Sequence, residues 1–114
     1  MPIESTTEGK IRVVKLSGRM SPELAVEFEQ ACQGATEAGL ALVVDIAELQ
    51  YVSSLGLRSF VQVAKAVRAA GGVGALCGMK GMVKEIFEMA HMGNLFRTFD
   101  SVDAALTSLA EPKQ

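Results

Sequence analysis

The side chains best placed for chemistry in this 114-residue sequence are the adjacent hydroxyls of Ser53 and Ser54, which stand at the start of a predicted helix. A serine at a helix N-terminus can cap free backbone amides. The same amides, together with the positive end of the helix dipole, also favour an anion at this turn. Arg58 follows Ser54 by four residues and either meets such an anion or lies on a solvated helix face. A plain capping pair is one interpretation of the two serines, and it stays open.

Side chains for catalysis or metal binding are scarce. His91 is the only histidine, and neither Cys32 nor Cys77 has a second candidate ligand nearby in the sequence. We expect both cysteines to be buried structural thiols and His91 to lie at a helix end. The glycine-rich segments 71–74 and 78–81 lack the spacing of dinucleotide-binding and phosphate-binding loops. The sequence therefore predicts no catalytic residue, no metal and no cofactor.

Four of the six methionines lie between residues 79 and 92, and such flexible side chains suit an adaptable binding surface. Core filling is the stronger expectation for Met82, because it falls on the apolar stripe of a helix predicted at 81–90. For Met79, Met89 and Met92, core and surface positions stay equally open.

Length and composition limit the class of protein. A chain of this size supports one core, so we assign residues 1–110 to one domain and 111–114 to a disordered tail. The net charge is −2 and no basic block occurs, which argues against nucleic acid as a partner. The longest apolar stretch, 40–46, contains Asp45 and is far shorter than the roughly 20 residues of a membrane span. No secretory signal is evident at the N-terminus, so we expect a cytoplasmic location.

Hydrophobic periodicity predicts alternating strands and helices. Residues 10–18 suit a strand with one wet face, paired as a hairpin with residues 3–7. The further elements expected are a helix from Ser21 to Gly39, strands at 40–46 and 73–77, a helix from 53–54 to 71, a helix at 81–90 and a helix opened by Ser101. The apolar stripe of the second helix is expected to comprise Leu57, Phe60, Val61, Ala64 and Val67. This order indicates an α/β fold, in which partners meet the loops beyond the strand carboxyl ends, here 49–56.

Residues 43–57 read Val-Val-Asp-Ile-Ala-Glu-Leu-Gln-Tyr-Val-Ser-Ser-Leu-Gly-Leu and resemble the signature of the STAS domain family, whose bacterial members include anti-sigma factor antagonists. In that family a central strand ends in Asp, and an Asp-Ser-Ser-Gly-Leu type motif opens the next helix. Residues 16–20 resemble the family's segment at the end of its second strand. Residues 95–101 resemble the segment that leads into its last strand and helix. The resemblance implies a single-domain STAS-like fold with a central mixed β-sheet of about four to five strands packed by about four α-helices.

The resemblance also implies a function in bacterial signal transduction and transcription regulation. Family members of this type bind an anti-sigma factor that has serine kinase activity, which frees the sigma factor. Phosphorylation of a serine at the start of the second helix breaks the complex, and a serine phosphatase restores it. The phosphate's charge of roughly −1.5 to −2 opposes burial in a desolvated interface, which accounts for the switch.

The sequence departs from the family pattern at the acceptor. Aligning Gly56-Leu57 with the Gly-Leu of the motif puts Leu55 at the usual phosphorylated serine and Ser54 at the serine before it. Either Ser54, or Ser53 next to it, takes over as acceptor, or the domain binds its partner without this switch. The second case matches a constitutive STAS subunit of a larger sensory or lipid-transport assembly. An enzyme ranks last, because no catalytic constellation is present.

The expected partner surface combines the motif loop, the second helix and the turn before the third. Its members are Ser53, Ser54, Leu55, Gly56, Arg58, Gln62, Met79 and Met82. Gly56 is expected to let a partner's backbone approach closely, so Gly56→Ala should cost no more than about 1 kcal/mol of stability if φ is negative. The oligomeric state expected is a monomer or weak homodimer.

Overall fold

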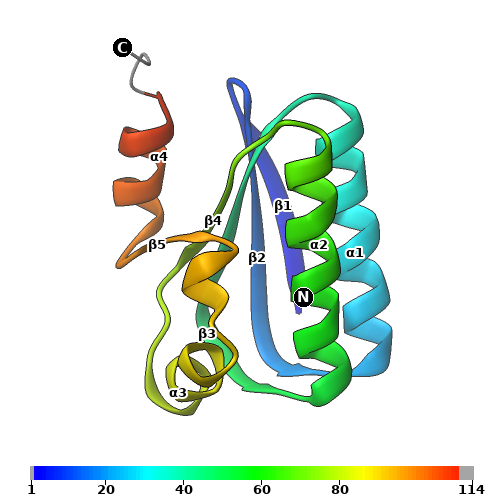
Figure 1. The fold of residues 1–114 in the computed structure, drawn as a ribbon, viewed down its shortest axis with the longest axis vertical. Helices are drawn as coiled ribbons and strands as arrows, with labels where there is room; N and C mark the ends of the chain where they lie inside the picture. The colour runs from blue at the N-terminus through cyan, green and yellow to red at the C-terminus, as the bar shows by residue number, and fades with distance from the viewer. Residues whose placement is uncertain (1, 111–114) are drawn as a thin grey trace.

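The computed structural model describes residues 2–110, and the expected tail at 111–114 lies outside them. Strands and helices alternate after an initial hairpin (Figure 1). In chain order the elements are β1 (Ile3–Glu8), β2 (Ile11–Met20), α1 (Pro22–Glu37), β3 (Ala41–Val52), α2 (Ser54–Ala69), β4 (Gly74–Cys77), α3 (Gly81–Met89), the short 3-10 helix η1 (Met92–Asn94), β5 (Arg97–Phe99) and α4 (Val102–Ala110). The predicted α/β fold, with its mixed sheet of four to five strands and about four helices, is confirmed.

The sheet has the strand order β1-β2-β3-β4-β5. β1 pairs antiparallel with β2 through a tight turn, and every later pair is parallel. A parallel neighbour requires a crossover connection, which explains why a helix separates each of these strands from the next. All four parallel strands therefore end at one edge of the sheet, which we call the carboxyl edge, and each is followed there by the start of a helix.

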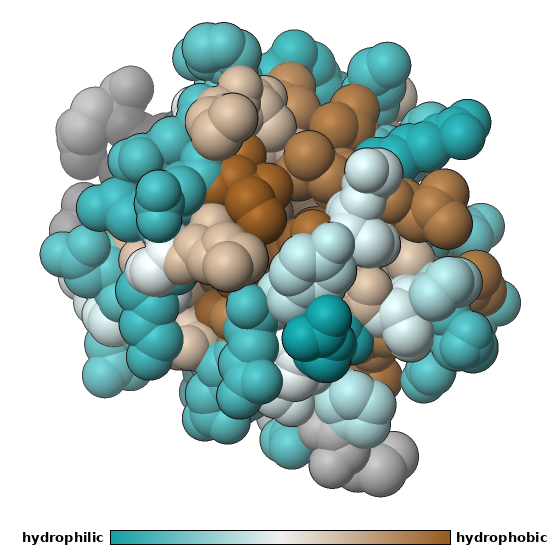
Figure 2. Space-filling model, turned by 90° about the horizontal axis from the view of Figure 1, so that it is seen from below, coloured by the Kyte–Doolittle hydropathy of each residue, from teal (hydrophilic) through white to brown (hydrophobic). Residues whose placement is uncertain are grey.

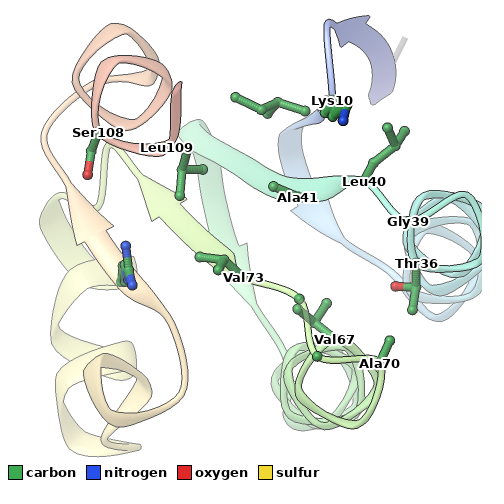
Figure 3. Close-up of a pocket in the computed structure, with 14 residues that line it drawn as sticks. Lys10, Thr36, Gly39, Leu40, Ala41, Val67, Ala70, Val73, Ser108 and Leu109 are labelled. Atoms are coloured by element: carbon green, nitrogen blue, oxygen red, sulfur yellow. The ribbon is translucent and has the colours of Figure 1, made fainter. Parts of the chain in front are cut away.

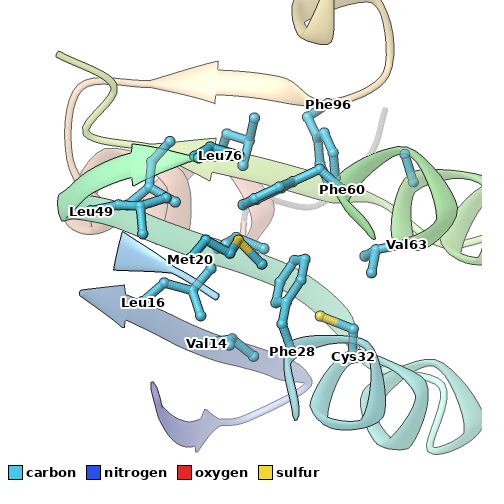
Figure 4. Packing of buried hydrophobic residues seen from close by; sticks show 14 of the residues in the cluster. Val14, Leu16, Met20, Phe28, Cys32, Leu49, Phe60, Val63, Leu76 and Phe96 are labelled. Carbon is cyan, nitrogen blue, oxygen red and sulfur yellow. The ribbon is translucent and has the colours of Figure 1, made fainter. Parts of the chain in front are cut away.

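Side chains alternate between two cores because successive strand residues point to opposite faces. Val14, Leu16 and Val44 pack beneath α1, α2 and α3, whereas Val43 and Cys77 pack beneath α4. The larger core is centred on Phe60 of α2, whose ring centroid lies 4.7 Å from that of Phe28 and 4.9 Å from that of Phe87. A fourth ring, Phe96, lies 6.5 Å away in an edge-on arrangement (Figure 4). These contacts join α1, α2 and α3.

The ends of α1 lie where the sequence predicts them. Ser21 is the N-cap, and its side chain accepts a hydrogen bond from the Leu24 N–H at 3.1 Å. Gly39 follows the last turn with a φ of +74°, a left-handed conformation that favours glycine. The apolar spacing also predicts that Leu24, Phe28, Ala31, Cys32 and Ala35 point inward, and all of these are buried except Ala31, which is half-buried.

Two expectations about length and orientation are wrong. β3 continues from the expected end at Ile46 to Val52, because its second half keeps pairing with β2 through two shifts of register. The expected loop 49–56 is thereby reduced to Ser53, between β3 and α2. Met82 is 59% exposed, because the inward face of α3 consists of Val83 and Phe87. On α2, the structure also buries Ser59 and Val63, and Leu57 and Val61 are only half-buried.

The packing of Phe60 generates the first prediction. Phe60→Ala should lower the free energy of unfolding by about 3–5 kcal/mol, because it removes the ring on which three helices converge. The same change at half-buried Phe99, on the edge strand, should cost clearly less. Urea unfolding followed by circular dichroism measures both, and equal losses would contradict the central role of Phe60.

Candidate functional site

Two helix starts lie side by side at the carboxyl edge. Met20 and Val52 are paired at the ends of β2 and β3, and the residues that follow them, Ser21 and Ser53, are the N-caps of α1 and α2. Both helices accordingly begin at the lower end of the molecule in Figure 1. The parallel pairing of β2 with β3 therefore brings the predicted motif next to the exit of β2.

Ser53 is fully occupied by structural hydrogen bonds. Its Oγ accepts from the Gly56 N–H at 3.2 Å and donates to the Met20 carbonyl at 3.5 Å. Its carbonyl accepts the first helical bond, from the Leu57 N–H at 2.8 Å. The capping interpretation is thus confirmed for Ser53, whose side chain faces β2.

Ser54 and Leu55 lie on the outside of the same turn. Ser54 is exposed, and its hydroxyl makes no hydrogen bond to any residue in the range 2–110. Leu55 is 55% exposed, a large fraction for an aliphatic side chain. Arg58 and Gln62 are exposed as well, one and two turns further along the helix from Ser54. The structure thus brings four of the predicted surface residues to one outer face of α2.

Gly56 lies on the inner side of this turn, against the ends of β2 and β3. A Cβ at this position would lie 2.9 Å from Cγ of Met20 and 3.2 Å from Cγ1 of Val52. Its φ is not in the left-handed region, so the requirement for glycine is one of space. The expectation that Gly56→Ala costs little is therefore corrected, because the close approach is to the protein's own strands.

Ser59 is a residue of the site that the sequence did not identify. It is 3% exposed, and its hydroxyl donates to Oε2 of Glu29 at 2.6 Å, with the Leu55 carbonyl at 3.3 Å as a second acceptor. This contact fastens the first turn of α2 to α1. The sequence offered no signal for it, because Ser59 lies outside the expected apolar stripe of the helix.

The carboxyl edge is rich in apolar surface, and Figure 2 views the molecule from this end, where hydrophobic side chains gather. Besides Leu55, the exposed large apolar side chains there include Met82 of α3 and Tyr51 near the end of β3. Tyr51 packs under the guanidinium of Arg19, which lies 4.8 Å from the ring centroid. Met79 is half-buried beside α3, and Met92 is buried.

A cleft of about 870 Å³ lies elsewhere, at the amino ends of the parallel strands and away from the carboxyl edge (Figure 3). Lys10 and Arg97 line it together with backbone at Gly39, Gly71 and Gly72. Among residues 2–110, those that line it include no Asp, Glu, His or Cys and none of the residues predicted for the partner surface. Its size alone does not make it the site, because its described lining has no carboxylate, imidazole or thiol and none of the motif residues.

The remaining candidate groups have structural surroundings. Burial raises the pKa of both Cys32 and Cys77 to about 12, so neither is a reactive thiolate near neutral pH. His91 is exposed at the end of α3 with a φ of 57°, and its N–H donates to the Glu88 carbonyl at 3.1 Å. Within residues 2–110, no three His, Cys, Asp or Glu side chains are grouped as a metal site. In the same range, every helix is too short or too polar to cross a bilayer.

Comparison with known proteins adds a family to this geometry. The family model of the STAS domain matches residues 2–105. A Bordetella bronchiseptica protein named "Putative anti-sigma factor antagonist BtrV" is 39% identical over 91 residues, which are 79% of this chain and 78% of that protein. An anti-sigma factor antagonist from Mycobacterium paratuberculosis has the same fold, with a TM-score of 0.83 at 19% identity over 96% of this chain and 93% of the other. The Bacillus cell fate determinant SpoIIAA, solved in its phosphorylated form, has a TM-score of 0.77 at 13% identity over 94% and 98% of the two chains.

The packing at Gly56 can be tested against a second glycine. Gly56→Ala should lower the free energy of unfolding by about 1–2 kcal/mol, because overpacking against Met20 and Val52 exceeds the gain in helix propensity. Gly34→Ala, in α1, should instead raise it by about 0.5–1 kcal/mol, since nothing lies within 4 Å of the added Cβ. Urea unfolding measures both, and a stabilised Gly56→Ala variant would contradict the packing described here.

Proposed function

The chain belongs to the STAS domain family, and on this premise we propose that it is an anti-sigma factor antagonist that acts by binding a serine-kinase anti-sigma factor. The observation that carries the proposal is the 39% identity, over about four-fifths of the chain, to a protein whose name describes it as an anti-sigma factor antagonist. The serine kinase activity of the partner is the part of the proposal that follows from membership of the family. In this proposal the protein acts by binding alone, without catalysis and without a metal or cofactor. Its place of action is the cytoplasm.

We place the partner on the outer face of the first turns of α2 and the adjoining start of α3. The surface comprises Ser53, Ser54, Leu55, Gly56, Arg58, Gln62, Met79 and Met82, of which Ser53 and Gly56 contribute by shaping the turn rather than by contact. Leu55 is its apolar centre, because a leucine that is 55% exposed stabilises a complex by leaving water. Arg58 and Gln62 add polar contacts at the side. Buried Ser59, bonded to Glu29 of α1, supports this turn from beneath.

Ser54 is the better phosphoacceptor of the two serines. The Ser53 hydroxyl already caps α2 and reaches the Met20 carbonyl, so its modification would sacrifice the cap. The Ser54 hydroxyl is exposed on the first helical residue, beside free amides that accommodate an anion. A phosphate there would put its charge of roughly −1.5 to −2 next to Leu55 and oppose the burial of this side chain.

A constitutive role in a larger assembly is the second candidate. The observation that favours it is Leu55, which offers no hydroxyl at the family's usual acceptor position. A subunit bound permanently to its neighbours has no need of a phosphorylation switch. Such a subunit would use the same apolar turn of α2 for a stable contact.

The partner surface is tested by paired alanine variants. A partner is first captured from native lysate and identified by mass spectrometry, and calorimetry then compares the variants. Leu55→Ala should weaken binding about tenfold or more, because a side chain buried in the complex is truncated. Val26→Ala, on the outer face of α1, is the matched control, since Val26 is also 55% exposed. Equal effects of the two changes, or none from Leu55→Ala, would contradict a partner surface at α2.

The switch is tested by incubation with the kinase-type partner and ATP, followed by site mapping. Modification should occur at Ser54, be lost in Ser54→Ala and persist in Ser53→Ala. Because misplacement of a nucleophile by about 1 Å can cost a hundredfold in rate, Leu55→Ser should be phosphorylated faster than the wild type. Binding without modification at either serine would exclude the displaced switch and favour the constitutive subunit.

A further inference from the structure

β1 is the outermost strand of the sheet, so one side of its backbone is not paired with any strand among residues 2–110 (Figure 1). It has six residues in uninterrupted register with β2, and all but Ile3 are exposed. The strand contains no proline and no bulge, two of the devices that protect edges against pairing. The outermost strand on the other side of the sheet, β5, has only three residues.

The hydrogen bonds of the hairpin show which backbone groups face outward. The Ser17 N–H donates to the Pro2 carbonyl at 3.0 Å, so Pro2 and Ser17 occupy a hydrogen-bonded position of the antiparallel ladder. Such positions alternate along the strand, which places Glu4, Thr6 and Glu8 in bonds to β2. The N–H and C=O groups of the residues between them, Ile3, Ser5 and Thr7, therefore point away from the sheet.

From this pattern we propose that β1 pairs antiparallel with β1 of a second copy of the chain, so that one sheet continues across a twofold axis at Ser5. Ser5 then faces Ser5, and Ile3 faces Thr7 of the second copy. Every outward N–H and C=O of the strand has a partner, since antiparallel residues at such positions exchange two hydrogen bonds.

The charges select this register. With the axis at Ser5, Glu4 faces Thr6 of the second copy and Glu8 faces Pro2. A shift by two residues in one direction sets Glu4 opposite Glu4, and a shift in the other direction sets Glu4 opposite Glu8. Like charges directly opposite each other are destabilising. Within its own chain, the negative charge of Glu4 lies directly across the hairpin from the positive charge of Lys15. The pKa of Lys15 is raised by Glu48 and, to a smaller extent, by Glu4.

The dimer should be weak and reversible, because one pair of short strands lies at the small end of specific interfaces. Sedimentation equilibrium of the purified chain should show a monomer and a dimer with a Kd between about 10 µM and 1 mM. A monomer at all concentrations up to about 1 mM would overturn the proposal. No other protein is added, so the outcome is independent of the proposed function.

Two pairs of variants locate the interface. Ser5→Pro removes an outward N–H, a substitution that edge strands tolerate, and should weaken the dimer at least tenfold, whereas Ser5→Ala should not. Residue 6 of each copy faces Glu4 of the other, so each dimer contains two such contacts. Thr6→Lys and Thr6→Glu each change both of them. The lysine variant should bind between about twofold and thirtyfold more tightly than the wild type, and the glutamate variant more weakly. Circular dichroism checks that each variant is folded. Unchanged dimerisation in Ser5→Pro, or the same affinity in both Thr6 variants, would overturn the proposal.

Discussion

The structure depends on the parallel pairing of β2 with β3. This pairing continues to Met20 and Val52, so both strands end at the same edge and each is followed at once by a helix. Ser53 joins the two strands directly, because its hydroxyl contacts the Met20 carbonyl while it caps α2. Gly56 lets the start of α2 approach these strand ends closely, since a Cβ there would lie 2.9 Å from Cγ of Met20 and would force this side chain to move.

The first turn of α2 consequently has two different sides. Ser53 and Gly56 face the strands and fix the position of the turn, whereas Ser54 and Leu55 face solvent. Behind them, Ser59 binds Glu29, and Phe60 packs against rings from two other helices. Because the inner side is rigid, the outer side keeps one shape. Little conformational entropy is therefore lost when a partner binds there. Substitutions on the inner side are therefore expected to act on stability, and those on the outer side on binding.

Most elements of the fold could be predicted from the sequence, because their signals are local. Caps such as Ser21, stops such as Gly39 and the spacing of apolar residues depend on a few neighbours along the chain. The second half of β3 was missed because its exposed residues, among them Glu48, carry no apolar signal. There Lys15 of β2 supports the strand through an ion pair with Glu48 at 3.1 Å, a contact that requires β2 and β3 to be adjacent.

By itself, the sequence determined the order of strands and helices apart from η1 and β5, the absence of a phosphate-binding motif and the position of the motif at the start of the second helix. These follow from the types and spacing of residues that are close in the chain. The tertiary structure alone decided which side of that turn is free: it assigned Ser53 to the cap, buried Gly56 under Met20 and exposed Met82. The physical reason is that exposure depends on which elements pack together, and the residues that cover Gly56 come from two strands that only the folded sheet places side by side.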